Sequence, residues 1–311
     1  MHILIIPGSI HAAPLVSHVI ALLDDLKSRN SMLDYTCVDA GTPSDGAYKT
    51  CFGADIVLAT PGARHATGVA EFAKVAGLHT ELHAISIPAE LKRFSPVSTR
   101  HARATDCLIL GDASRSTKNT HTGGVVAGEH ELVGWHTQRY TEGDIRRLAH
   151  RAFGLARTRS CRLTSVDRSD RMDVMGMWRD IVSETAVLYP DIRLEHLLVE
   201  QAIERFVVEP DGFDTVLAGG DLAPLLAAQA SALTGFPGLL TRARMGDGPT
   251  ALYEIGLPVH MELPACLEVD LDACAAANAV SLLLRHPPQD SMPNRPACPP
   301  QIPGAIPSLR H

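Results

Sequence analysis

The chain of 311 residues is 45% hydrophobic and 20% charged, enough to bury a sizeable core as one large domain or two smaller lobes. Its formal net charge of -7 and its pI near 6.1 give no electrostatic reason to expect nucleic acid or an anionic membrane surface as the main partner. No apolar run approaches the roughly 20 residues of a membrane-spanning helix, and His2–Ile6 is too short for a secretion signal, so a cytoplasmic location is expected.

The chain opens with a pattern typical of a strand, a loop and a helix. The apolar run His2–Ile6 meets Pro7 and Gly8, and apolar residues then recur at helical spacing from Leu15 to Leu23. Further apolar runs of strand length lie between helical segments, at Ala54–Ala59, Ala84–Ile87, Asp106–Leu110 and Asp214–Leu217. This alternation predicts an α/β fold.

Three helices are predicted in the second half of the chain. The clearest is Glu142–Arg157, which has apolar residues on one face and a capping pattern at Thr141. The second runs from about Met172 to Leu188 and ends before a proline, and the third covers Glu195–Val207. From residue 287 to 311 the chain is rich in proline, which predicts a tail that is disordered or lies along the surface.

The seven cysteines are scattered, with no CxxC pair and no spacing typical of zinc ligands. We therefore expect reduced thiols.

The segment Thr164–Leu240 carries a specific series of motifs. They are a Ser-Val-Asp turn, a Trp-Arg helix, a Tyr-Pro-Asp-Ile break, a Leu-Val-acid segment, a Phe-Asp strand and an Ala-Ser-Ala-Leu-Thr-Gly run. In order and spacing this resembles the central block of the isopropylmalate/isocitrate dehydrogenase family, the β-decarboxylating dehydrogenases, and weaker likeness extends to about residue 286. The resemblance implies a two-lobed α/β fold. It places the first lobe at residues 1–82 plus 236–286, the second lobe, with the dimerisation region, at 83–235, and the proline-rich tail at 287–311.

The chemistry of this family requires a divalent cation held by aspartates, which stabilises the enolate left when CO2 departs. The resemblance places two of the three aspartate positions at Pro224 and Ala228 and the third at Glu200, so no metal site is predicted. The general-base lysine of the family corresponds to Arg168 and its neighbouring asparagine to Asp170. Because arginine stays protonated, Arg168 is unable to accept the proton, although it can clamp a carboxylate.

Other positions that bind substrate or cofactor in the family also differ here. The catalytic tyrosine falls near Lys118, and an upstream substrate arginine aligns with His83. In the cofactor loop only His260 remains as a contact for NAD. We therefore predict no cofactor, with NAD binding left as an open alternative.

Further candidates come from the residues themselves. Arg64 and His65 follow a strand end, where open α/β sheets bind ligands, and Arg115 lies in a polar, basic segment that either holds an anion or is a solvated loop. His79 and His83 are four residues apart, the spacing of a two-histidine metal face on a helix, but no third ligand follows at a fixed spacing.

The candidate residues therefore fall into three groups. Arg168, Lys118, Asp170, Glu200 and His65 are the candidate catalytic residues, Arg64, His83 and Arg115 would bind substrate, and His260 would contact a cofactor. A surface ion-pair cluster is the alternative for Arg168, Asp170 and Arg171.

The sequence leaves three functions open. One is a repurposed enzyme that uses the interlobe cleft without metal on a small anionic metabolite, by lyase, decarboxylase or isomerase chemistry. The second is a non-catalytic paralogue that binds a metabolite or a homologous active subunit, and the third is a dehydrogenase with relocated ligands. Whether the chain is an enzyme is thus left open, and a homodimer is expected.

Overall fold

The computed structural model describes residues 1–8, 12–38, 51–62, 67–86, 89–96, 106–113, 123–233, 235–257 and 270–288. Within these ranges, no helix combines the length and the apolar character needed to cross a membrane. Cys161 is disulfide-bonded, so the prediction of reduced thiols is wrong for this residue. The predicted proline-rich tail lies outside the described residues, except for Pro287 and Pro288.

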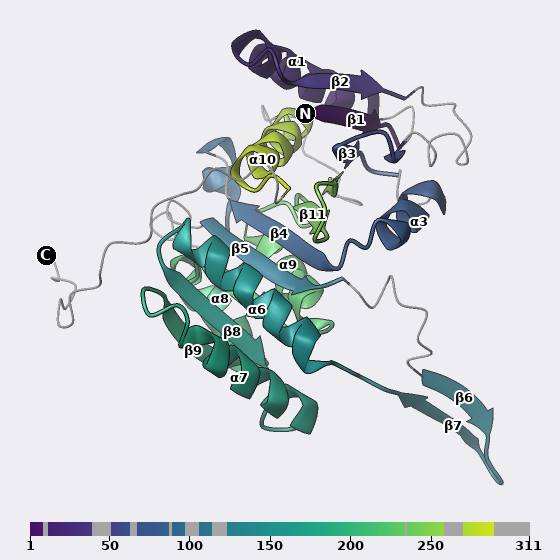
Figure 1. Cartoon of the computed structure of the whole chain (residues 1–311), viewed down its shortest axis with the longest axis vertical. Coiled ribbons are helices and arrows are strands. Elements are labelled where there is room, and N and C mark those ends of the chain that lie inside the picture. Colours follow the sequence, from purple (N-terminus) through teal and green to yellow (C-terminus); the bar gives the residue numbers. More distant parts are fainter. Residues whose placement is uncertain are drawn as a thin grey trace, which may run out of the picture.

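Ten strands form one mixed sheet, and a separate two-stranded hairpin projects from the body of the molecule (Figure 1). The sheet strands are β1 (His2–Ile6), β2 (Asp34–Cys37), β3 (Ile56–Ala59), β4 (Thr80–Ser86), β5 (Asp106–Asp112), β8 (Arg162–Asp167), β9 (Arg193–Leu198), β10 (Thr215–Ala218), β11 (Thr241–Met245) and β12 (Ala251–Ile255). Their order across the sheet is β2-β1-β3-β12-β11-β4-β5-β10-β8-β9. The hairpin consists of β6 (Gly123–Ala127) and β7 (Leu132–His136).

The strands change direction in the middle of the sheet. β11 is antiparallel to both β12 and β4, and β4 is antiparallel to β5, whereas the other neighbouring strands are parallel. The carboxyl ends of β3, β12 and β4 therefore lie at one edge of the sheet, and those of β5, β10, β8 and β9 lie at the other. Because open α/β sheets bind ligands outside the carboxyl ends of strands, both edges are candidates for a site.

Helices cover both faces of the sheet, as an α/β fold requires (Figure 1). On one face lie α1 (Ala13–Arg29), α6 (Glu142–Arg157), α7 (Asp173–Ala186) and α10 (Leu271–Arg285). On the other lie α3 (Thr67–Val75), α8 (Val199–Val208) and α9 (Leu222–Ala232). Two short 3-10 helices, η3 (Ala89–Phe94) and η4 (Pro210–Gly212), complete the described elements.

β1 shows why the first apolar run is continuous rather than alternating. Ile3 and Ile5 pack in the same core cluster as the buried side chains of α1, while Leu4 and Ile6 pack in the cluster that contains α3. A strand that is covered on both faces needs apolar residues at every position.

The helix prediction for the second half of the chain is confirmed for α6 and α7. α6 has the predicted bounds, and the Thr141 hydroxyl accepts a hydrogen bond from the Asp144 amide at 3.1 Å. The third prediction is wrong at its beginning, because Arg193–Leu198 is strand β9 and the helix starts only at Val199. Parallel pairing of β9 with β8 outweighs the helical spacing of its leucines.

The sheet continues without a break from β4 to β5, whose residues pair from Thr80 to Ser86. The predicted lobe boundary at residues 82 and 83 falls inside β4. The division into two lobes stays a prediction.

Candidate active site

A hollow of about 430 Å³ opens at the carboxyl ends of β3 and β12, between these strands and the last turns of α9. We call it the central cleft. Its lining includes Thr60, Gly62, His83, Ala228, Arg242 and Glu254. Gly62 adopts a positive φ of 92° that permits the tight turn after β3, and a Cβ there would lie only 3.1 Å from the Gly8 carbonyl oxygen.

Charged residues from three adjacent strands form a buried row at the floor of the central cleft. Strand register places Arg242 of β11 opposite His83 of β4 on one side and opposite Glu254 of β12 on the other. Arg242 donates through Nη1 to Glu81 Oε1 at 2.9 Å and through Nε to Glu254 Oε2 at 2.9 Å. The guanidinium group of Arg242 is thus held between two carboxylates.

Glu81 is ionised in this environment despite its burial. Burial alone would raise its pKa, but His83 and the guanidinium groups of Arg242 and Arg244 outweigh this and hold the pKa well below its ordinary value. The two arginines and the carboxylates of Glu81 and Glu254 therefore balance in charge.

His83 is the residue of this row that still has a ring nitrogen available for a hydrogen bond, among the residues that the structure describes. It is 3% exposed, and its Nε2 lies 3.0 Å from Glu81 Oε1 without hydrogen-bond geometry. Its Nε2 is thus in ion-pair contact with Glu81, whereas its Nδ1 has no hydrogen-bond partner among the described residues. Because buried polar atoms are normally satisfied, this Nδ1 is a candidate contact for a ligand in the hollow.

The residues of α9 do not suit a divalent cation. Pro224 and Ala228 are exposed one helical turn apart, and Ala228 lines the central cleft with a methyl group. In the described part of the chain, no three His, Cys, Asp or Glu side chains are grouped so that they could hold a metal ion. Hard cations such as Mg²⁺ need oxygen ligands, which neither residue supplies from its side chain.

The structure brings Arg168 and Glu200 together. Arg168 directly follows β8, and Glu200 lies in the first turn of α8, which follows β9, so both lie at the carboxyl ends of two paired strands. Arg168 Nη2 donates to Glu200 Oε1 at 3.1 Å, and both side chains are partly exposed. The backbone of Glu200 and this contact with Arg168 hold the pKa of Glu200 below its ordinary value. Asp170 instead forms an exposed ion pair with Arg171 at 3.3 Å. None of these four residues lines the central cleft of its own chain.

The two-histidine interpretation of His79 and His83 is wrong. The segment Thr80–Ser86 is a strand, and His79 precedes it rather than lying on a helix. His79 Nε2 lies 3.1 Å from Asp247 Oδ1, whereas His83 faces Glu81.

The remaining predicted site residues are outside the part of the chain that the structure describes. They are Arg64, His65, Arg115, Lys118 and His260.

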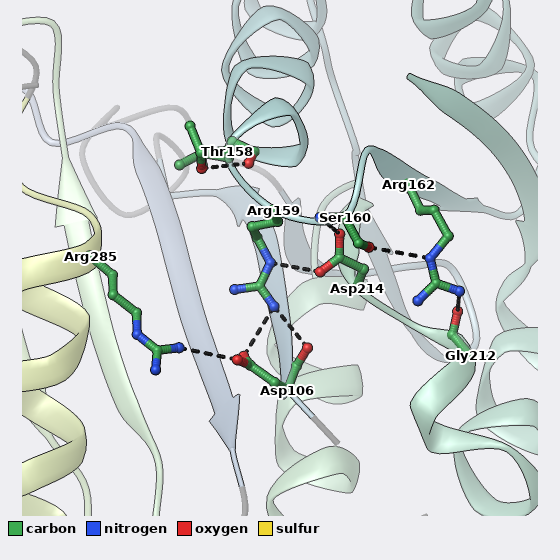
Figure 2. Close-up of polar contacts among 9 residues, drawn as sticks. Asp106, Thr158, Arg159, Ser160, Arg162, Gly212, Asp214 and Arg285 are labelled. Carbon is green, nitrogen blue, oxygen red and sulfur yellow. Dashed lines mark hydrogen bonds and ion pairs between the residues drawn. The ribbon is translucent and has the colours of Figure 1, made fainter. Parts of the chain in front are cut away.

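A second polar network lies at the amino ends of β5, β8 and β10, and Figure 2 shows it. Arg159, which follows α6, donates to Asp214 Oδ1 at 2.8 Å and to Asp106 Oδ1 at 3.0 Å (Figure 2). Arg285 at the end of α10 also donates to Asp106, at 3.1 Å (Figure 2). Because these charges satisfy one another, we regard the network as a structural tie.

Arg242, Glu254 and Glu81 were not among the residues predicted for the site. The sequence Thr241–Met245 alternates charged and apolar residues, which is the signal of a strand with one charged face. Which acidic residues would neutralise that face depends on strand order, and this is not readable from local sequence.

The chain is similar in sequence to known proteins of one family. A family model described as isocitrate/isopropylmalate dehydrogenase matches residues 25–287. The 3-isopropylmalate dehydrogenase of Nitrosomonas europaea is 33% identical over 217 residues, which cover 70% of this chain and 59% of that protein. The one from Thiobacillus denitrificans is 27% identical over 307 residues, covering 92% and 86%.

The fold also has a solved counterpart. The TT0538 protein from Thermus thermophilus superposes with a TM-score of 0.67 at 18% identity, over 91% of this chain and 58% of that chain. This likeness bears on the fold alone. The chain spans about three fifths of the length of the first curated relatives that it matches, at 59% for each of two of them. On the strength of the family-model match over residues 25–287, the chain belongs to the isocitrate/isopropylmalate dehydrogenase family.

Proposed function

We propose that the central cleft binds a small anionic metabolite without a divalent cation, and that His83 exchanges a proton with it. Lyase, decarboxylase or isomerase chemistry on a small acid would use such a group. The observation that carries the proposal is that one hollow holds a buried imidazole, His83, whose Nδ1 has no hydrogen-bond partner among the described residues, and a methyl group, Ala228, where a metal ligand would be needed.

Charge balance supports an anionic ligand. Arg242 and Arg244 are offset by Glu81 and Glu254, so protonation of His83 leaves the row with one excess positive charge. A carboxylate that accepts a hydrogen bond from a protonated imidazole gains a charge-assisted contact. An imidazole is suited to this role because its ring nitrogens can both donate and accept a proton.

A thermal-shift screen of small mono- and dicarboxylates tests the proposal, with each compound measured in EDTA and again in millimolar Mg²⁺. We expect the best ligands to raise Tm equally in both conditions. His83→Gln should abolish the shift, because glutamine fills a similar volume but does not titrate. His130→Gln is the matched control, since that residue is exposed in the turn between β6 and β7.

Incubation of the best ligand with the protein, followed by mass spectrometry, then separates catalysis from binding. Product formation that is lost in His83→Gln supports the enzyme. Binding without product supports the alternative of a non-catalytic paralogue. A ligand shift that requires Mg²⁺, or one that His83→Gln leaves intact, contradicts the proposed site.

A dehydrogenase is the second candidate, and the names of the curated relatives favour it. Its test is the formation of NADH or NADPH at 340 nm from isopropylmalate, isocitrate or malate with Mg²⁺ present. We expect no signal above background, because position 168 is an arginine and Ala228 offers no carboxylate. Turnover on the order of 1 s⁻¹, within the usual range of enzymes, would establish the dehydrogenase instead.

We also propose that the chain forms a homodimer. Its support is the apolar surface on α8 and α9 and on the hairpin, where Ile203, Val207, Leu225 and Trp135 are all more than two-fifths exposed. Ile203, Val207 and Leu225 lie on α8 and α9, which contact each other, and exposed apolar residues on adjacent elements are typical of an interface. In such a dimer the Arg168–Glu200 pair of one subunit is proposed to reach the cleft of the other.

A further inference from the structure

A second hollow, of about 510 Å³, lies on the α6 side of the sheet, and we call it the α6 hollow. Arg147, Arg151 and Gly154 line it from α6, and Leu82 and Met245 line it from β4 and β11. Successive residues of a strand point to opposite faces, so Leu82 faces this hollow while His83 faces the central cleft. The two hollows are separate, and ligand binding in the α6 hollow is independent of the function proposed for the cleft.

Arg151 is a partly buried cation that lacks an acidic partner among the described residues. Its Nη1 donates to the Gly246 carbonyl oxygen at 2.9 Å, and its Nη2 contacts Met245 Sδ at 3.4 Å. No described Asp or Glu lies within ion-pair distance of it, although a guanidinium group has five N–H donors and favours a carboxylate. Burial lowers the pKa of Arg151, and the more distant charge of Asp247 only partly offsets this.

None of the other charged groups described around the hollow forms an ion pair with Arg151. Arg147, one turn earlier on α6, is paired with Asp144 at 2.8 Å, but its buried Nε has no hydrogen-bond partner in the described chain. Asp247 is on the rim, largely exposed, and lies 3.1 Å from His79 Nε2.

The two remaining titratable side chains of the lining are histidines. His150 Nδ1 lies 3.0 Å from the Tyr189 hydroxyl, and His286 is buried at the end of α10.

The remaining wall of the α6 hollow is apolar. Leu82, Leu155 and Met245 present hydrocarbon and thioether surface beside the two guanidinium groups. A site with an apolar wall and a few convergent polar groups is typical of small-molecule binding, and its volume lies within the usual range for such sites.

We propose that the α6 hollow binds a small molecule that carries a carboxylate and an apolar tail. The carboxylate accepts hydrogen bonds from the guanidinium group of Arg151, and the tail lies against Leu82, Leu155 and Met245. Such a ligand supplies the missing counter-ion of Arg151 and covers the apolar wall at the same time.

Calorimetric titration of the full chain with hexanoate, hexan-1-ol and acetate tests both halves of the ligand. We expect hexanoate to bind about tenfold or more tightly than hexan-1-ol, which lacks the carboxylate, and than acetate, which lacks the tail. Arg151→Gln should remove the preference for hexanoate over hexan-1-ol, because the variant lacks the guanidinium group that binds the carboxylate. Arg146→Gln is the matched control, because Arg146 lies on the same helix but pairs with Glu142 and Glu184 outside the hollow.

A second variant keeps the test decisive should Arg151→Gln not fold. A Cβ at Gly154 meets no atom within 4 Å, so Gly154→Leu fills the hollow without a clash of its Cβ and removes a glycine from the middle of a helix. We expect this variant to melt at a higher temperature than the parent chain and yet to lose hexanoate binding. Gly176→Leu in α7, where a Cβ also has open space, should gain stability and bind hexanoate normally.

Equal affinity for hexan-1-ol and hexanoate would overturn the proposal. So would undiminished hexanoate binding by Gly154→Leu, or the absence of hexanoate binding at about millimolar concentration in the parent chain.

Discussion

At the scale of single residues, Glu81 is a buried carboxyl group whose ionisation contributes to the stability of the fold in acid. Its pKa is depressed in the folded chain relative to an ordinary value near 4.5. A depressed carboxyl pKa stabilises the fold above the unfolded-state pKa, and this stabilisation is lost as the pH falls toward the folded-state pKa.

Glu81→Gln should therefore make the free energy of unfolding depend less on pH in the acid range. We expect the free energy of unfolding of the parent chain to fall between about pH 5 and pH 3 more steeply than that of the variant. Urea denaturation at a series of pH values measures this difference. Parallel curves would mean that Glu81 keeps its ordinary pKa and that the row around Arg242 is not formed.

Residues of the candidate site were predictable only where the family resemblance supplied the register. Arg168 and Glu200 are 32 positions apart in sequence, and the resemblance grouped them together; they form an ion pair, although neither lines the central cleft of its own chain. The row of His83, Arg242 and Glu254 depends instead on which strands are neighbours. Of these, only His83 was predicted, because hydrogen-bond pairing between distant strands leaves no local pattern.

At the scale of elements, the network of Figure 2 ties α6 and α10 to the first residues of β5 and β10. Arg159 is 12% exposed on its side chain and neutralises Asp214 and Asp106 together. Removing one partner of a largely buried ion pair leaves an uncompensated charge, which costs several kcal/mol.

We predict that Arg159→Met lowers the free energy of unfolding by about 3 kcal/mol. Arg162→Met is the matched control, since Arg162 bonds only the Ser160 hydroxyl and the Gly212 carbonyl oxygen among the described residues, and it should cost about 1 kcal/mol. Chemical denaturation of both variants gives the comparison. Equal losses would show that the carboxylates at Asp106 and Asp214 do not depend on Arg159.

Elements with strong local signals were predicted well. α6 has a hydroxyl cap, acidic residues in its first turn and one apolar face, so its bounds follow from local chemistry alone. β9 lacks such signals, because its leucines also suit a helix and its strand state depends on pairing with β8. The α/β class was therefore correct, whereas the boundary between β9 and α8 required tertiary structure.

At the scale of the whole molecule, the proposed homodimer predicts unequal effects of two similar substitutions. Val207 on α8 is 59% exposed and Val75 on α3 is 57% exposed. Val207→Glu should shift the protein toward monomers, because a charge buried at an interface is costly. Val75→Glu is the control and should leave the association unchanged.

Sedimentation velocity at micromolar concentration distinguishes these outcomes. A parent chain that sediments as a monomer would exclude the homodimer, and equal dissociation by both variants would exclude α8 as part of the interface.

The alternation of side chains along β4 has a consequence for communication across the sheet. Leu82 and His83 are consecutive residues, yet they face two different hollows, and Met245 and Arg242 repeat this arrangement on β11. Occupants of the two hollows would be separated by the thickness of one strand. If an occupant of one hollow shifts β4 and so alters affinity in the other by some factor, thermodynamic linkage requires the second occupant to alter the first affinity by that same factor.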